Sequence, residues 1–252
     1  MIQRMILSSE NSGGGVWMDS LYPLIEDRKR AAAQAAVGEV RAGMLVGLGT
    51  GSTAAFAISA LGDKVRDGLD IRAVATSAWT ARMAAQAGIS LLDLADIAQV
   101  DLCIDGVDEI DPAFRAIKGA GGAMLSEKIV ASAARRMIAI ADGSKAVATL
   151  GGRPVPVEVL PIARTFVAGQ LAALGCVPTL RCGEGQAPAR TDHGNIIVDC
   201  QFDLLDDPAT LAGQLSSIPG VLGHGLFLTE IDALYLGTAD GVVRTDRRIG
   251  QN

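Results

Sequence analysis

The sequence predicts an α/β protein: a Rossmann-like parallel sheet with helices on both faces, plus a small ferredoxin-like α+β domain. Between residues 27 and 142, short and nearly unbroken apolar runs alternate with helix-like segments, which is typical of parallel strands buried on both faces. After Gly151-Gly152 the predicted order of elements changes to βαββαβ, the order of a ferredoxin-like unit. Two later apolar runs, 233–236 and 241–244, are expected to return to the larger sheet.

The larger domain is expected to comprise residues 18–152 and 235–252. An alanine-rich helix is predicted over 27–40, and a strand at 44–48 leads directly into a glycine loop. The polar, glycine-rich residues 1–17 are predicted to be a disordered extension. The further elements predicted in this domain are helix 54–61, strand 71–75, helix 78–87, strand 89–92, strand 100–104, helix 123–134 and strand 137–141.

The smaller domain is expected to comprise residues 153–234. Its first strand is predicted at 155–159, a β-rich run that is bordered and interrupted by prolines. The remaining elements predicted in this domain are helix 163–174, strands 179–182 and 196–198, helix 208–218 and strand 221–228.

Composition and charge narrow the classes of partner. The net charge is -6 and no long run of lysine and arginine occurs, so neither nucleic acid nor a membrane is expected as a partner. No stretch is apolar enough over roughly 20 residues to span a bilayer. The four cysteines form no C-x-x-C pair and only two histidines occur, so no metal site is expected. Because no secretory signal is visible, we expect a cytoplasmic protein with reduced thiols.

A glycine-rich loop, GLGTGST at 47–53, stands between a predicted strand and a predicted helix. In open α/β sheets ligands bind at the carboxyl ends of strands, where glycines and free N–H groups can hold an anion. The loop lacks the lysine of a Walker loop, and Ser52 stands where a dinucleotide fingerprint has its third glycine. The next strand ends in Thr76-Ser77, and these hydroxyls suit a phosphate better than a ribose. A tight turn without a ligand stays open as the alternative.

Four carboxylates follow the strand at 100–104: Asp105, Asp108, Glu109 and Asp111. Asp105 ends a buried strand, which is where catalytic groups collect in such sheets. For Glu109 and Asp111 we favour a solvated loop and a helix cap. The spacing does not match a calcium-binding loop, so we rank a divalent metal below proton chemistry.

Lys118, Glu127 and Lys145 complete the candidate site. Lys118 begins the loop KGAGG, where a cation beside backbone N–H groups can stabilise an oxyanion; an ordinary surface lysine is the alternative. On the predicted helix the neighbours of Glu127 at three and four residues are apolar, so burial would raise its pKa and suit it as a general base. A Glu127–Lys128 pair on a frayed helix end stays open. Lys145 follows a strand end, where it would bind an anionic substrate or occupy a turn.

Taken in order, the segments GLGTGST, DGVDEI, KGAGGA followed by SEK, DGSK and PVEV resemble the type A family of ribose-5-phosphate isomerases. The resemblance covers about residues 21–244. It implies conversion of D-ribose 5-phosphate to D-ribulose 5-phosphate without a cofactor or metal, in a homodimer or homotetramer. One departure is Ala120, where the family has glycine; a positive φ there would strain the loop. The resemblance also implies substrate contacts from Thr50, Gly51, Ser52 and Thr53 at the phosphate, from Asp105, Gly106, Val107, Asp108, Lys118, Gly119, Ala120 and Gly121 at the sugar, and from Lys145.

The same resemblance implies a mechanism. Asp105 or Asp108 would assist opening of the furanose ring, and Glu127 would move the proton from C2 to C1 through a cis-enediolate. Lys118 and loop N–H groups would stabilise the charge on the oxygens. Three alternatives stay open: another phosphosugar enzyme or an acyl-CoA transferase on a similar scaffold, a non-catalytic sugar-phosphate sensor, and a nicotinamide-dependent oxidoreductase, which Thr76-Ser77 disfavours.

Overall fold

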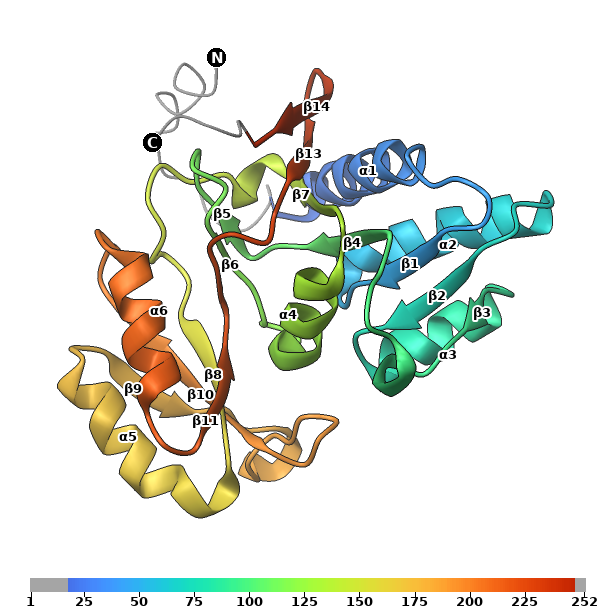
Figure 1. The fold of residues 1–252 in the computed structure, drawn as a ribbon. Coiled ribbons are helices and arrows are strands. Elements are labelled where there is room, and N and C mark those ends of the chain that lie inside the picture. The colour runs from blue at the N-terminus through green and yellow to red at the C-terminus, as the bar shows by residue number, and fades with distance from the viewer. Residues whose placement is uncertain (1–17, 248–252) are drawn as a thin grey trace.

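The computed structural model describes residues 18–247 and contains a seven-stranded sheet, in the upper part of Figure 1. The strand order is β14-β13-β7-β4-β1-β2-β3, and all neighbours are parallel except β13 and β14, which form a hairpin. The two C-terminal strands therefore return to the larger sheet, as predicted. The strands are β1 (Leu45–Leu48), β2 (Arg72–Ala75), β3 (Ser90–Leu91), β4 (Leu102–Gly106), β7 (Met137–Asp142), β13 (Ala233–Thr238) and β14 (Gly241–Asp246).

Helices cover both faces of this sheet. On one face, helices α1, α2 and α3 contribute Ala33, Leu61 and Ala84 to a shared apolar core, whereas α4 packs on the other face through Val130. Helix α2 continues to Arg66, past the predicted end at residue 61. Gly62 within it packs closely on Ala87, whose Cβ lies 2.7 Å from where a Cβ of residue 62 would be, so a larger side chain would not fit. The helices are α1 (Met18–Val37), α2 (Ser52–Arg66), α3 (Ala78–Gln86) and α4 (Met124–Ala133).

A second sheet has four antiparallel strands in the order β11-β8-β10-β9. With α5 and α6 packed on one face through Val157, Val167 and Leu215, this arrangement is ferredoxin-like, as predicted. We propose that this sheet and its helices form the small domain expected over residues 153–234, of which residues 233–234 already belong to β13 of the larger sheet. Its elements are β8 (Val155–Val159), α5 (Arg164–Ala173), β9 (Val177–Leu180), β10 (Ile196–Gln201), α6 (Pro208–Ser217) and β11 (Val221–His224).

The prediction of one strand over 221–228 is wrong. The run divides at Gly225, and its second half joins a three-stranded sheet in the order β12-β6-β5. A glycine is needed at the division, because a Cβ on Gly225 would lie 2.1 Å from the carbonyl oxygen of Lys118 and 2.7 Å from Pro156. The backbone of Lys118 is therefore tied to the junction of two sheets. The short strands are β5 (Glu109–Ile110), β6 (Ala116–Ile117) and β12 (Leu226–Phe227).

The predicted disordered extension, residues 1–17, lies outside the described residues, as do residues 248–252. Within the described part of the chain, no helix is both long and apolar enough to cross a membrane.

Candidate functional site

Loops at the carboxyl ends of β1, β4 and β7 surround a cavity of about 260 Å³, together with the loop that precedes α4. These strand ends meet because neighbouring strands of the sheet run parallel. Of the predicted substrate-binding residues, only Asp105 does not line the cavity. The lining residues are Lys29, Thr50, Gly51, Ser52, Thr53, Gly106, Val107, Asp108, Lys118, Gly119, Ala120, Gly121, Glu127 and Lys145.

The first glycine loop brings backbone N–H groups to the cavity. Gly49 lies against Asp105, since a Cβ on Gly49 would be 1.8 Å from Oδ1 of that carboxylate. The N–H of Thr50 donates to the same Oδ1 at 3.1 Å. Gly51, with a φ of 104°, turns the chain into α2, whose first N–H groups have no side-chain cap. The N-terminus of α2 therefore faces the cavity, which suits an anion.

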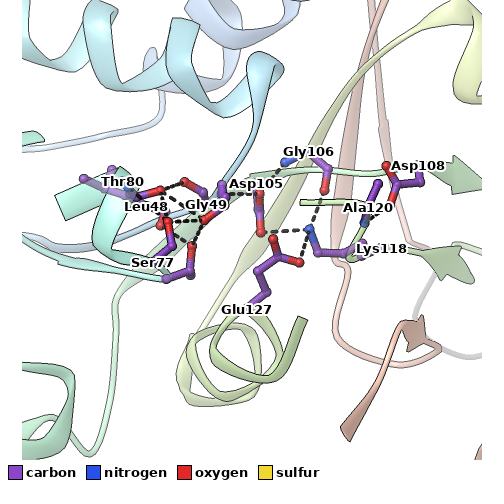
Figure 2. Close-up of polar contacts among 12 residues, drawn as sticks. Leu48, Gly49, Ser77, Thr80, Asp105, Gly106, Asp108, Lys118, Ala120 and Glu127 are labelled. Atoms are coloured by element: carbon purple, nitrogen blue, oxygen red, sulfur yellow. Dashed lines mark hydrogen bonds and ion pairs between the residues drawn. The ribbon is translucent and has the colours of Figure 1, made fainter. Parts of the chain in front are cut away.

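Hydroxyl groups from the end of β2 and from α3 support this loop (Figure 2). The Thr50 hydroxyl lies 2.8 to 3.0 Å from the hydroxyls of Thr76, Ser77 and Thr80, and three partners exhaust the capacity of a hydroxyl. Thr80 also donates to the carbonyl oxygen of Gly49 at 2.8 Å. Thr76 and Ser77, which the sequence suggests for a phosphate, do not line this cavity; both contact Thr50 of the loop, and Ser77 lines a neighbouring cavity.

A cluster of Asp105, Lys118 and Glu127 lies beside the loop (Figure 2). At most 3% of each side chain is exposed. Lys118 Nζ donates to Asp105 Oδ2 at 2.8 Å and lies 3.3 Å from Glu127 Oε2. Asp105 also accepts the N–H groups of Thr50 and Gly106, at 3.1 and 2.7 Å. Asp105 is thus held behind the cavity wall, while Lys118 and Glu127 line the cavity itself.

One cation shared by two buried carboxylates leaves this cluster short of positive charge. Burial raises the pKa of Glu127 to about 8; Lys118 opposes the shift and the charge of Asp105 adds to it. Burial also raises the pKa of Asp105, against the effect of Lys118. For Lys118 burial acts to lower the pKa, but the two carboxylates outweigh it and raise the pKa. Because Asp105 has three donors and Glu127 Oε2 has no aligned donor, Glu127 is the group that holds a proton near neutral pH.

The second glycine loop, residues 118–121, is held from two sides. Lys118 Nζ donates to the carbonyl oxygen of Gly106 at 2.5 Å, and the N–H of Ala120 donates to Asp108 Oδ2 at 2.9 Å (Figure 2). Gly119 has a φ of 103°, but Ala120 is not among the positive-φ residues of the described chain. Its methyl group therefore imposes no backbone strain, and the departure from the family's glycine leaves the loop intact.

Two further lysines line the cavity. Lys145 lies in a short 3-10 turn after β7, which Asp142 caps by accepting the N–H of Ser144 at 2.9 Å. Lys29, which the sequence analysis missed, comes from α1, and its Nζ lies 3.2 Å from Ser52 Oγ. The local sequence around Lys29 contains no motif, because its place in the site depends on how α1 packs. Next to the N-terminus of α2, Lys29 adds positive charge where an anion would bind.

One expectation about neighbouring charges is wrong, and one alternative that the sequence left open is not what the structure shows. Glu109 and Asp111 do not lie on a solvated loop: each is 4% exposed, Glu109 within β5 and Asp111 in the turn that directly follows it. Glu109 accepts a backbone N–H of the loop near β8, and Asp111 closes its own turn. Lys128 does not face Glu127; its Nζ donates to the carbonyl oxygen of Leu226 at 2.5 Å. Glu127 therefore has Lys118 as its partner.

Fold and cavity together are those of an α/β protein with a small-molecule site at the carboxyl ends of its parallel strands. Residues 18–247 contain no group of three or more histidine, cysteine, aspartate or glutamate side chains that could hold a metal ion. The cavity lies at the carboxyl ends of parallel strands, next to a cluster of two buried carboxylates and a lysine, and this arrangement suits a small anionic molecule.

Comparison with known proteins identifies the family within this class. The family model of ribose 5-phosphate isomerase A (phosphoriboisomerase A) matches residues 72–241. The ribose-5-phosphate isomerase A of Sphingopyxis alaskensis is 51% identical over 214 residues, which are 85% of this chain and 93% of the relative. The Methanosarcina acetivorans enzyme is 49% identical over 218 residues, 86% of this chain and 92% of the relative. The chain belongs to the ribose 5-phosphate isomerase A family.

Solved structures agree with this assignment. Ribose 5-phosphate isomerase A of Methanocaldococcus jannaschii superimposes with a TM-score of 0.84 at 38% identity, covering 88% of this chain and 99% of that one. A D-ribose-5-phosphate isomerase in complex with phospho-erythronic acid gives a TM-score of 0.86 at 36% identity, with the same coverage. The fold class predicted from the sequence is confirmed.

Proposed function

We propose that this protein interconverts D-ribose 5-phosphate and D-ribulose 5-phosphate, with Glu127 as the general base. The observation that carries the proposal is the pairing of Glu127 with Lys118 on the wall of an anion-binding cavity. A carboxylate with a pKa raised to about 8 is a stronger base than an exposed one, and a fraction of it is ionised near neutral pH. Removal of a proton from carbon requires such a base.

The rest of the cavity supports the same reaction. The N-terminus of α2, Ser52, Thr53 and the two lysines Lys29 and Lys145 would bind the phosphate. This remote contact would fix C1 and C2 against Glu127, so that binding energy supports the chemical step. Glu127 would take the proton from C2 and return it to C1 through a cis-enediolate. Lys118 and the N–H groups of its loop would stabilise the negative oxygens.

The two aspartates would have different tasks. Asp108 lines the cavity, so we assign assistance in opening the furanose ring to Asp108. Asp105 lies behind the wall with its oxygens occupied by Lys118 and two N–H groups. We therefore assign Asp105 the task of holding Lys118 and the first glycine loop in place. The chain would need no cofactor or metal for this reaction, and it would assemble as a homodimer or homotetramer, which sedimentation velocity would measure.

A direct assay tests the proposed function. We expect the protein to form ribulose 5-phosphate from ribose 5-phosphate with EDTA present and no nucleotide added. Glu127→Gln should lower kcat by about 10²- to 10⁴-fold, the usual contribution of a general base. The variant should still bind phospho-erythronic acid in a calorimetric titration, because the phosphate contacts remain. A kcat in Glu127→Gln equal to that of the wild type would reject Glu127 as the base.

A further inference from the structure

Arg181 connects the small sheet with the second glycine loop. It follows β9, and its guanidinium group makes two hydrogen bonds to Asp199 on β10: Nε to Oδ2 at 2.8 Å and Nη2 to Oδ1 at 2.5 Å. The remaining nitrogen, Nη1, donates to the carbonyl oxygens of Gly119 at 3.1 Å and Ala120 at 2.9 Å. The bidentate pair thus fixes the guanidinium plane, and the plane in turn holds two successive peptide groups of the loop.

These contacts set the direction of the loop's N–H groups. The C=O and N–H of a trans peptide point in opposite directions. The peptide between Gly119 and Ala120 is held at both ends, by Arg181 at its oxygen and by Asp108 at its nitrogen. The next peptide is held by Arg181 at its oxygen, so the N–H of Gly121 points away from Arg181. Gly121 lines the cavity, and no residue within 18–247 accepts its N–H.

We propose that Arg181 is a positioning residue for the isomerisation: it aims the N–H of Gly121 at a substrate oxygen, and Asp199 holds the guanidinium group for this task. The proposal rests on the proposed function. Arg181 is not part of the lining of the catalytic cavity; it lines a neighbouring cavity that shares Ala120 and Gly121 with it, and we assign its effect to its hold on the loop. A donor that is fixed before charge develops stabilises an enediolate without reorganisation of the site.

A purely structural role explains the arrangement less well. The side chains of Arg181 and Asp199 are 20% and 21% exposed, and ion pairs that water reaches add little to stability. Arg190, which bridges to Ile196 at the start of β10, has a guanidinium group whose one hydrogen bond among the described residues is from Nη1 to the carbonyl oxygen of Gly194 in its own turn, at 2.9 Å. Arg181, in contrast, connects β10 of the small sheet with the loop that carries Lys118.

Steady-state kinetics of Arg181→Ala test the proposal. We expect kcat to fall by about 10- to 100-fold, less than complete loss of an oxyanion donor would cause. KM should change by less than about threefold, because the lysines at the phosphate remain. Added methylguanidinium should restore part of the lost kcat, whereas Arg181→Lys should not, because an ammonium group cannot make the planar, bidentate contact.

Matched variants separate this role from others. Arg190→Ala should behave as the wild type. Asp199→Asn should lower kcat less than Arg181→Ala, and the double variant should be no worse than Arg181→Ala, because Asp199 acts through Arg181. The proposal is overturned if Arg181→Ala keeps the wild-type kcat. It is also overturned if the loss of activity in Arg181→Ala parallels a loss of folded protein and methylguanidinium restores no kcat. If that variant does not fold, an unchanged kcat in Asp199→Asn overturns it. A wild type without isomerase activity would instead reject the proposed function.

Discussion

Glu127 is a carboxylate whose surroundings oppose its charge. Met124, Val130 and Ala131, one helical turn away on either side, are all buried, and the only cation within 4 Å among the described residues is Lys118, which Asp105 shares. The environment therefore makes Glu127 a stronger base and at the same time makes the folded state less stable when Glu127 is ionised. Catalysis and stability thus have opposite requirements at this residue, and each can be measured.

The pH dependence of kcat/KM should follow the ionisation of Glu127. Under the proposed function, kcat/KM rises with pH through a midpoint at about 8, because only the ionised carboxylate accepts a proton. Asp105→Asn removes a negative charge that raises this pKa, so the midpoint should move to lower pH. Asp63→Asn, at an exposed position near the end of α2, should leave it unchanged. A wild-type midpoint at the ordinary value of 4.5 would contradict the assignment.

Glu127→Gln should stabilise the fold in alkaline solution. The folded pKa of Glu127 is raised from 4.5 to about 8, so between these values the folded state binds a proton that the unfolded state releases. The contribution of Glu127 to stability therefore falls as the pH rises through this window. Glutamine does not ionise, so the variant should melt a few degrees higher than the wild type at about pH 9 and at nearly the same temperature at about pH 5. Thermal melts at both pH values test this; an equal difference at both would show that Glu127 is not protonated in the fold.

At the scale of elements, helix α3 stabilises the glycine loop between β1 and α2, which is distant from it in the sequence. Thr80 is fully buried, and its hydroxyl donates to Gly49 in the turn between β1 and α2. Thr80→Val keeps the volume but leaves the Gly49 carbonyl oxygen without this donor, at an expected cost of about 1–3 kcal/mol. KM should rise more than kcat falls, because the loop is assigned to the phosphate. Thr80→Ser keeps the hydroxyl and should retain the wild-type KM. Equal KM values in the two variants would show that the Thr80 hydroxyl does not hold the glycine loop in its binding conformation.

The elements that could be predicted from the sequence are those with local signals. The strand ends at Asp105 and at Asp142 and the two glycine loops follow from apolar runs, glycines and the rule that parallel strands end together. The burial of Glu127 follows from helical spacing. The three-stranded sheet has two-residue strands, which are too short to show any periodicity. The run 221–228 looks continuous because the division at Gly225 results from contacts with Lys118 and Pro156, more than sixty residues away in the chain.

At the scale of the molecule, the remaining site residues depend on packing between distant parts of the chain. Lys29 reaches the cavity because α1 lies against β13, a strand about two hundred residues later in the chain. Arg181 reaches the glycine loop because the small sheet packs against α4 through β8 and β11 (Figure 1). Neither contact has a signal in the neighbouring sequence. The sequence therefore predicts the reacting groups better than it predicts the groups that hold them.

The last prediction concerns the close contact between α1 and β13. A Cβ on Gly237 in β13 would lie 2.1 Å from the carbonyl oxygen of Arg28, and Gly237 pairs with Asp142 at the start of the turn that carries Lys145. Gly237→Ala should therefore displace α1 and shift Lys29. We expect KM for ribose 5-phosphate to rise by about tenfold, which corresponds to a loss of about 1.4 kcal/mol in binding free energy. The change in kcat should be smaller.

Gly241 in the same hairpin is the matched control. It has a φ of 119° and no atom within 4 Å of an added Cβ, so Gly241→Ala should destabilise the hairpin through backbone strain alone. Both variants should melt at a lower temperature than the wild type, but only Gly237→Ala should raise KM. Melting curves and kinetics on the two proteins separate the effects. If KM rises equally in both, general loss of stability explains it; if it rises only in Gly237→Ala, β13 holds α1 in the position that the phosphate contact needs.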